Sequence, residues 1–257
     1  MPTLTQLSDF LDSTLNVGAI PDYPNAVNGV QVANFGAING VATAVDFSTE
    51  TVNGAINAGA RLLVVHHGMF WSGVQPLVGH RHQRLWALLT HDVAVYSAHL
   101  PLDVHPSLGN NALLAKRLGL QPTGGFARYQ TIDVGLRGTS DLPTRVLAER
   151  AGELAAQHGG HLIASPFEPD RVTRAWGICT GAGADSTTLR EAAAKGLDTL
   201  IVGEGPHHTG VEARELGIVV LYAGHYATET LGVQALGDLL AAQFQITATF
   251  IDAPTGL

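Results

Sequence analysis

Short apolar runs alternate with amphipathic segments along most of this chain. An apolar run of about four to eight residues between turn residues is typical of a buried strand, whereas apolar residues three and four positions apart are typical of a helix. On this basis we predict strands at 40–47, 61–67, 93–99, 129–136, 161–164, 172–180, 198–202 and 218–223. We predict helices at 4–11, 48–58, 83–90, 110–118, 143–157, 187–195, 209–215 and 228–244.

The alternation of strands and helices predicts an α/β fold built from two interlinked, layered subdomains. Both halves of the chain repeat the order strand, helix, strand, helix, strand, helix. Internal duplication would explain this repeat, and a regular α/β chain could also produce it by chance. The turn residues Pro122-Thr123-Gly124-Gly125 indicate the boundary. The first subdomain is therefore expected at 1–124 and the second at 125–257, and the C-terminal segment could pack back on the first.

The composition narrows the class of protein. Of the 257 residues, 46% are hydrophobic and 14% are charged, so the chain can bury a large core. The net charge is −8 without a basic run, which disfavours nucleic-acid binding because that affinity depends on neutralising phosphates. The single cysteine, Cys179, excludes an internal disulfide and a cysteine-cluster metal site. No apolar run reaches transmembrane length and no signal-peptide pattern is present, so a cytoplasmic protein without membrane contact is expected.

Two adjacent histidines, His66 and His67, end the apolar run 62–65. In open α/β sheets, ligands bind beyond the carboxyl ends of the strands. Successive side chains of a strand point to opposite faces, so the two rings can converge where the strand gives way to a loop. Because histidine is the commonest metal ligand, the doublet is a candidate metal site. The alternative is one packed histidine and one exposed histidine.

Other predicted strands also end in histidine or carboxylate residues. His99 and Asp103 follow one strand, Glu204 follows a second, and His225 and Glu229 follow a third. Residues four apart on a helix share a face, so His225 and Glu229 would present an imidazole and a carboxylate to one point. The alternative for Glu229 is a favourable interaction with the dipole at an exposed helix start.

Five of these side chains form a mixed nitrogen and oxygen donor set, namely His66, His67, Asp103, His225 and Glu229. Without thiolate ligands, soft-metal and iron–sulfur chemistry is disfavoured. A single tetrahedral zinc with an open position needs fewer ligands than this. The set therefore suits two divalent ions per chain, chosen from Zn, Mn, Fe, Co and Ni, with a bridging carboxylate between them.

Several strings of the sequence resemble one known family. They lie at 28–32 (NGVQV), 65–71 (VHHGMFW), 98–106 (AHLPLDVHP), 109–112 (GNNA), 203–204 (GE) and 223–229 (AGHYATE). In this order they are similar to the bacterial GTP cyclohydrolase I type 2 homologues, also called the NGG-interacting-factor-three-like family. The resemblance implies a two-part α/β fold, a dinuclear metal site between the parts and a ring-shaped homohexamer. It also places the metal ligands on His66, His67, Asp103, His225 and Glu229, and the family name implies a nucleotide substrate, GTP.

Two functions remain open at this stage. The first is a metal-dependent hydrolase, cyclohydrolase-like or phosphoesterase-like, in which His99 and Glu204 are candidates for proton transfer or for orienting the ligands. Arg81 and Arg128 could add charge for a phosphate, although nothing in the sequence singles them out. The second is a non-catalytic ring hexamer that stores, delivers or senses ions or serves as an adaptor. A cleft with open coordination positions would favour the hydrolase, and a closed site would favour the structural role.

Overall fold

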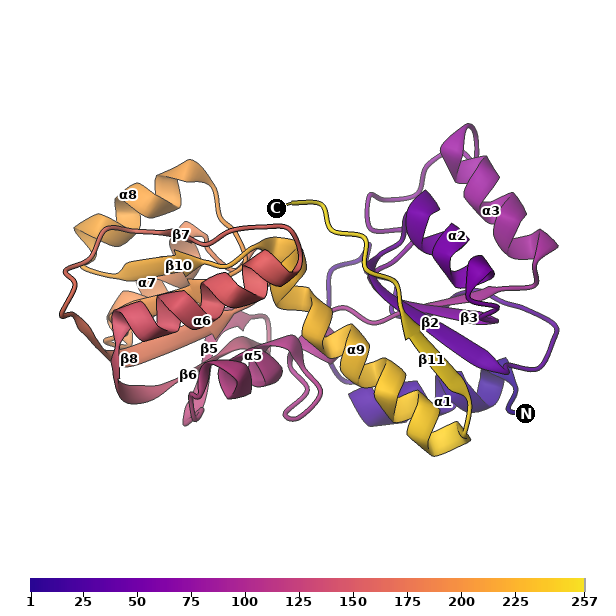
Figure 1. Ribbon diagram of the computed structural model, residues 1–257, viewed down its shortest axis with the longest axis horizontal. Helices are drawn as coiled ribbons and strands as arrows, with labels where there is room; N and C mark the ends of the chain where they lie inside the picture. Colours follow the sequence, from indigo (N-terminus) through magenta and orange to yellow (C-terminus); the bar gives the residue numbers. More distant parts are fainter. Residues whose placement is uncertain (257) are drawn as a thin grey trace. The chain divides into compact units, whose positions relative to one another are not determined.

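The computed structural model describes residues 1–256, which form two compact units (Figure 1). Unit 1 comprises Met1–Leu102 and Gly232–Ala253, and unit 2 comprises Asp103–Leu231 and the chain from Pro254 onward. Each unit has its own mixed β-sheet with helices, so the predicted α/β fold is confirmed. The boundary expected at 124 differs from this division, because helix α5 (Asn110–Leu118) packs within unit 2.

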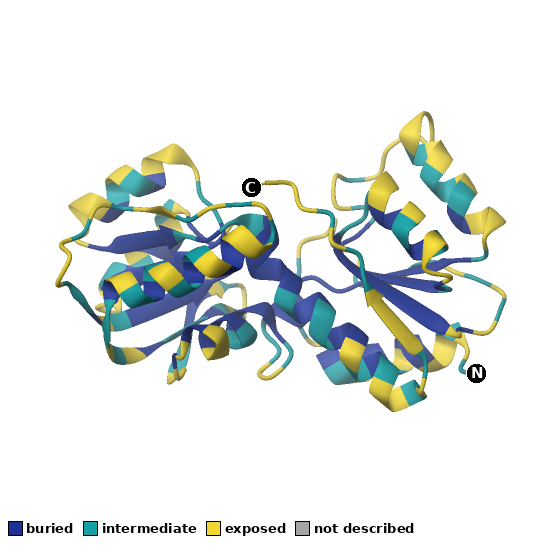
Figure 2. Cartoon of the chain, viewed as in Figure 1, coloured by how far each residue is buried: buried dark blue, intermediate teal, exposed yellow. Residues whose placement is uncertain are grey.

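The sheet of unit 1 has the strand order β1-β4-β3-β2-β11. Its strands are β1 (Gly29–Val32), β2 (Gly40–Asp46), β3 (Leu62–His67), β4 (Ala94–Ser97) and β11 (Thr247–Phe250). Strands β11, β2, β3 and β4 run parallel to one another, and β1 is antiparallel to β4. The three central strands are almost entirely buried (Figure 2), as continuous apolar runs predict for parallel sheets. The C-terminal segment returns to unit 1, where β11 pairs with β2.

Three longer helices belong to unit 1, namely α1 (Leu4–Leu15), α2 (Thr49–Asn57) and α3 (His80–Thr90). Ser48 caps α2, since its hydroxyl accepts a hydrogen bond from the Thr51 N–H at 3.1 Å. Gly59 follows the end of this helix with a φ of 69°, the left-handed conformation in which glycine commonly ends a helix. Val52 and Ala55 of α2 are buried in a cluster with side chains of the central strands.

The sheet of unit 2 has the strand order β5-β6-β8-β9-β10-β7. Its strands are β5 (Gly124–Tyr129), β6 (Ile132–Pro143), β7 (Ile163–Ala164), β8 (Val172–Cys179), β9 (Thr199–Val202) and β10 (Val219–Tyr222). Strands β8, β9 and β10 are parallel, and the remaining pairings are antiparallel. Both units therefore contain three adjacent parallel strands in chain order, with an antiparallel strand beside the third.

The helices of unit 2 are α5, α6 (Thr144–Gln157), α7 (Ser186–Ala194) and α8 (His207–Glu215). Asp185 caps α7, and its carboxylate accepts a hydrogen bond from the Thr188 N–H at 2.7 Å. Two helices cross the division between the units along the chain, the short α4 (Leu100–Asp103) and the 20-residue α9 (His225–Phe244). Within residues 1–256, no helix combines the length and the apolar character needed to span a membrane.

The prediction of one strand at 129–136 is wrong. The structure has a hairpin here, in which β5 ends at Tyr129 and β6 begins at Ile132. Gln130 in the connecting turn has a φ of 47°, the left-handed conformation that tight hairpin turns require. Strands β1 and β11 were not predicted from the pattern, because they are half-exposed edge strands without a long apolar run.

Candidate metal centre

Three buried histidines lie together at one edge of the unit 1 sheet. His66 and His67 are the last residues of β3, and His99 follows the end of the parallel neighbour β4. The ring centroids of His66 lie 4.7 Å from His67 and 4.8 Å from His99. One ligand atom from each of the three rings lies within 4.8 Å of the others, so this cluster could hold a metal ion. Parallel strands bring their carboxyl ends to the same edge, which explains the convergence.

The Nδ1 atom of each of these rings is held by an oxygen atom of unit 1. The contacts are His66 Nδ1 to the Ala98 carbonyl at 2.8 Å, His67 Nδ1 to Asp46 Oδ1 at 2.9 Å and His99 Nδ1 to Asp22 Oδ1 at 2.8 Å. An imidazole that donates its Nδ1–H in this way carries its lone pair on Nε2. Metal-binding histidines are oriented in the same manner, with the second nitrogen donating to a carboxylate or carbonyl.

Asp22, the partner of His99, is a residue that the sequence did not single out. Both side chains are buried, with 6% of Asp22 and 8% of His99 exposed. Burial alone would raise the pKa of Asp22, but the hydrogen bond and charge of His99, together with donation from Asn28 and Tyr23, lower it below its usual value. Asp22 Oδ2 also accepts hydrogen bonds from Asn28 Nδ2 and the Leu100 N–H, each at 2.8 Å. This carboxylate therefore stays ionised and fixes the orientation of His99.

A second group of donors lies in unit 2, where β9 and β10 end. Glu204 follows β9, and His225 follows β10 as the first residue of α9. His225 Nδ1 donates to Glu204 Oε1 at 2.8 Å, and His225 Nε2 lies 3.1 Å from Glu229 Oε2 one helical turn later. The predicted shared face of His225 and Glu229 is thus present, and α9 begins three residues earlier than predicted. Glu204 orients the imidazole in the way that Asp22 orients His99.

The charge environment of His225 favours its protonated form in the metal-free protein. Desolvation by burial is the largest influence and lowers the pKa of this imidazole. The hydrogen bonds and charges of Glu229 and Glu204 together outweigh it and raise the pKa to about 9. A metal ion would have to displace this proton, because a ligating imidazole must be neutral.

Glu229 and Asp103 are joined through the segment after β8. Gly181 has a φ of 63°, and a Cβ atom built on it would lie 2.0 Å from Glu229 Oε1. The neighbouring Thr180 hydroxyl lies 3.5 Å from Asp103 Oδ1, which also accepts a hydrogen bond from Asn110 Nδ2 at 2.8 Å. Only glycine leaves this space open to the Glu229 carboxylate. Asp103, Glu229 and His225 therefore belong to one buried or half-buried group in unit 2.

Comparisons with known proteins identify one family over nearly the whole chain. The family model described as Duf34/NIF3 (NGG1p interacting factor 3) matches residues 2–255. The chain belongs to this family. A "GTP cyclohydrolase 1 type 2 homolog" of Treponema pallidum is 38% identical, with 99% of this chain and 100% of the relative covered. One of Halobacterium salinarum is 41% identical, with 93% and 94% covered. The solved structure titled "protein ybgI, unknown function" has a TM-score of 0.87 and 34% identity, and covers 99% and 100% of the two chains.

In this Duf34/NIF3 chain, the predicted site residues fall into two groups. Unit 1 contributes His66, His67 and His99, and unit 2 contributes Asp103, Glu204, His225 and Glu229. Sequence reasoning missed Asp22, the role of Asp46 as the partner of His67, and the space that Gly181 leaves for Glu229. Cys179 lies near the second group, but burial raises the pKa of its thiol to about 12, so it does not supply a thiolate. The available donors are nitrogen and oxygen, which fit the divalent ions predicted above.

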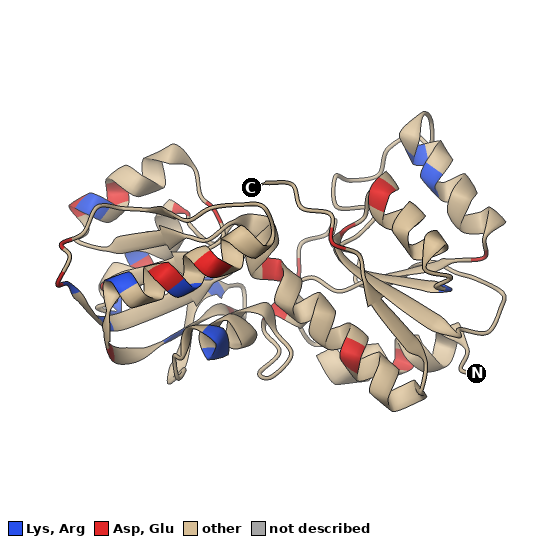
Figure 3. Ribbon diagram, viewed as in Figure 1, with Lys and Arg blue, Asp and Glu red and all other residues tan. Residues whose placement is uncertain are grey.

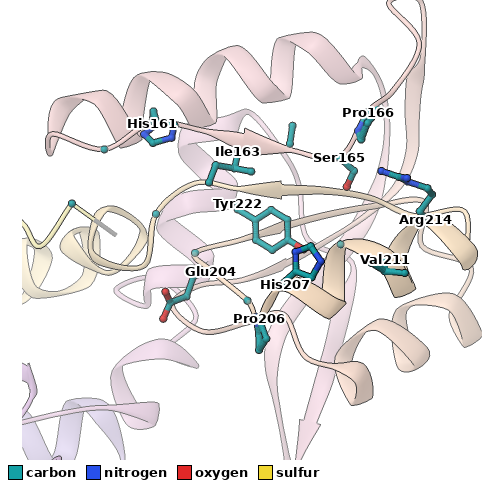
Figure 4. Close-up of a pocket in the computed structure, with 17 residues that line it drawn as sticks. His161, Ile163, Ser165, Pro166, Glu204, Pro206, His207, Val211, Arg214 and Tyr222 are labelled. Carbon is teal, nitrogen blue, oxygen red and sulfur yellow. The ribbon is translucent and has the colours of Figure 1, made fainter.

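Unit 2 of this family member also has a cavity of about 570 Å³ beside the donors. Glu204 forms part of its wall, and Figure 4 shows Tyr222 between Glu204 and Arg214. The Tyr222 hydroxyl is tied to Thr209 Oγ1 at 2.8 Å, which fixes the ring in the wall. The volume lies in the range of small-molecule sites, about 300–1,000 Å³. A molecule bound there would lie beside Glu204, the residue that holds His225.

Proposed function

We propose that this chain is a metal-dependent hydrolase that binds two divalent ions through His66, His67, Asp103, His225 and Glu229. The observation that carries this proposal is a hydrogen-bonding pattern shared by four histidines, namely His66, His67, His99 and His225. In each of them an oxygen atom accepts from Nδ1 at 2.8 or 2.9 Å. Histidines that only fill a core do not need this uniform orientation, whereas histidines that bind metal through Nε2 do.

Divalent ions bound by these donors would lower the pKa of a water molecule toward neutrality and so supply a nucleophile. The residues of the chain contribute orientation and proton transfer. Asp22 holds the proton on His99 Nδ1, and Glu204 holds the proton on His225 Nδ1. Glu204 is 45% exposed and forms part of the wall of the cavity of about 570 Å³, whereas His99 is buried. Glu204 is therefore the better placed of the two predicted catalytic residues to exchange a proton with a substrate.

The alternative is a protein that handles ions without catalysis. The same donors would serve that role, so the decision depends on access for a substrate. Cavities adjoin both donor groups, one beside His67 in unit 1 and one beside Glu204 in unit 2. Structural metal sites are usually closed by protein ligands, whereas catalytic sites keep an open position. Access therefore favours the hydrolase.

The substrate is best sought among nucleotides and phosphoesters. The relatives in Treponema pallidum and Halobacterium salinarum are named GTP cyclohydrolase 1 type 2 homologs, so GTP is the first candidate. The test is a turnover screen of the metal-loaded protein with GTP and simple phosphoesters, comparing wild type with Glu229→Gln. Turnover that requires both metal and Glu229 supports the proposal. Metal binding in the wild type without turnover of any of these compounds favours the ion-handling alternative.

We further propose the ring-shaped homohexamer as the working assembly, on the basis of the family resemblance. Light scattering of the purified chain tests this directly. A mass of about six times 26.9 kDa supports the hexamer, and a monomer or dimer at the same concentration contradicts it.

A further inference from the structure

A polar cavity of about 260 Å³ adjoins His67 in unit 1. Its wall includes Asp46 at the end of β2, Trp71 from the segment after β3, and His80, Arg81 and Arg84 from α3. The Trp71 ring lies against His67, with 4.6 Å between the ring centroids. The cavity thus connects a predicted metal ligand to the beginning of a helix.

The beginning of α3 carries the wrong charge for an isolated helix. The positive end of a helix dipole favours acidic residues, and α3 instead starts with His80, Arg81 and His82, with Arg84 in the next turn. No acidic residue and no side-chain cap is present in this first turn. Figure 3 shows two basic bands and no acidic band on α3. An anion would complement both the dipole and the basic side chains.

The guanidinium groups of Arg81 and Arg84 have N–H donors that could bind a ligand. Arg84 lies over the Phe47 ring at 4.9 Å, and its Nη1 donates to the Phe47 carbonyl at 3.1 Å. Within residues 1–256, neither Arg81 nor Arg84 forms an ion pair with a carboxylate, and Asp46 is instead paired with His67. Burial, with the nearby charge of Arg81, lowers the pKa of Arg84.

We propose that this cavity binds a phosphate group of the substrate, held by Arg81 and Arg84 and the start of α3. This proposal rests on the proposed function, since it names the substrate class of the same site. Two guanidinium groups and an imidazole, at the positive end of a helix dipole, together suit an anion with several oxygen atoms and more than one negative charge. The cavity is smaller than the range of about 300–1,000 Å³ typical of complete ligand sites, so it accepts the phosphate end of a larger molecule.

The test uses the full chain after metal removal with a chelator, so that bound metal does not contribute to anion binding. Inorganic phosphate and pyrophosphate are titrated by calorimetry against wild type, Arg81→Gln, Arg84→Gln and Arg84→Lys. Arg145→Gln is the matched control, because Arg145 is an exposed arginine of α6 paired with Glu149. Pyrophosphate is expected to bind more tightly than phosphate. Each Gln variant should weaken binding roughly 10-fold or more, with a smaller loss for Arg84→Lys, which keeps the charge but loses the fork of N–H donors.

Equal affinity in Arg81→Gln, Arg84→Gln and Arg145→Gln would overturn the proposal, and so would a wild type that binds neither anion. Metal content is measured on separate, metal-loaded samples of the same variants. Normal metal content without anion binding refutes the anion site alone. Arginine-dependent anion binding in a chain that binds no metal supports the anion site and refutes the metal proposal.

A methyl phosphate titration distinguishes a substrate ester from free phosphate, since binding of the ester at similar affinity supports a substrate site. Failure of methyl phosphate to bind contradicts a substrate site.

Discussion

The two units place a histidine after the third parallel strand of each sheet, but they support that histidine differently. In unit 1, His99 follows β4 and is oriented by Asp22 from a loop before β1. In unit 2, His225 follows β10 and is oriented by Glu204 after β9. The first carboxylate is 6% exposed, and the second is 45% exposed and lines a cavity. The same strand arrangement therefore yields one buried histidine–carboxylate contact, His99–Asp22, and one partly solvent-exposed contact, His225–Glu204.

The segment after the first parallel strand differs between the units as well. In unit 1, β2 ends in Asp46, whose carboxylate holds His67. In unit 2, Gly181 follows β8 and has no side chain, so the Glu229 carboxylate occupies the space. At this position unit 1 has a carboxylate that orients the predicted ligand His67. Unit 2 has a glycine, which leaves space for the predicted ligand Glu229. The substitutions below test these differences in order of their expected effect on metal affinity.

The largest effect is expected for Gly181→Ala. The new Cβ would lie 2.0 Å from Glu229 Oε1 in a backbone conformation with φ of 63°, so the Glu229 carboxylate must move. We expect metal affinity to fall by about 100-fold or more and the free energy of unfolding to fall by more than about 1 kcal/mol. Calorimetric metal titration and urea unfolding measure the two quantities.

Gly59→Ala is the matched control, because Gly59 has a similar φ of 69° but no atom within 4 Å of the added Cβ. It should reproduce the loss of stability and leave metal affinity unchanged. Equal metal affinity in both variants would show that the space at Gly181 is not used by a ligand.

A smaller and unequal effect is expected when the two supporting carboxylates are neutralised. Asp22→Asn removes a buried acceptor that also binds Asn28 Nδ2 and the Leu100 N–H, and it releases His99, whose ring packs against the ligands His66 and His67. Metal affinity should therefore fall about 30-fold. Glu204→Gln removes a half-exposed acceptor, which water can partly replace, so the fall should be about 10-fold. Metal competition with a chromophoric chelator measures both values. A larger loss of metal affinity in Glu204→Gln than in Asp22→Asn would contradict the expectation that the buried carboxylate matters more than the exposed one.

The last prediction concerns the pH dependence of stability in the metal-free protein rather than metal affinity. The folded-state pKa of His225 is raised to about 9, above its ordinary value. The folded chain therefore binds the extra proton more tightly, and this stabilisation is complete below about pH 6.5 and is lost as the pH rises through 9. It amounts to up to about 3 kcal/mol. Urea unfolding between pH 6 and 10 should show this decline in the free energy of unfolding of wild type and a flatter pH profile in His225→Gln. Parallel profiles in the two proteins would argue against a raised pKa of His225.

Much of the fold could be predicted because its signals are local. Ser48 and Asp185 cap α2 and α7, which were predicted as helices at 48–58 and 187–195, and the buried apolar runs form the central strands. The edge strands β1 and β11 could not be predicted, because half-exposed edges lack a continuous apolar run. The hairpin at Gln130 was missed because its left-handed turn contains no glycine or asparagine.

The site could be predicted only in part for a related reason. The donor residues follow strands directly, so the strand pattern identifies them. Asp22 lies 77 residues before His99 in a loop, and no periodicity connects the two positions. Gly181 looks like an ordinary turn residue, and its role emerges only when α9 brings Glu229 against it. Local patterns therefore identify ligands, whereas the groups that orient them depend on tertiary contacts.

The central claim is that the donors of both units bind divalent ions, and metal analysis of the purified chain tests it most directly. Wild type is compared with His67→Ala from unit 1 and Glu229→Ala from unit 2. His91→Ala and Glu149→Ala are the exposed controls. We expect about two equivalents of metal per chain in wild type and in the controls, with a sharp fall in both site variants. One equivalent in wild type that Glu229→Ala leaves unchanged would contradict the claim.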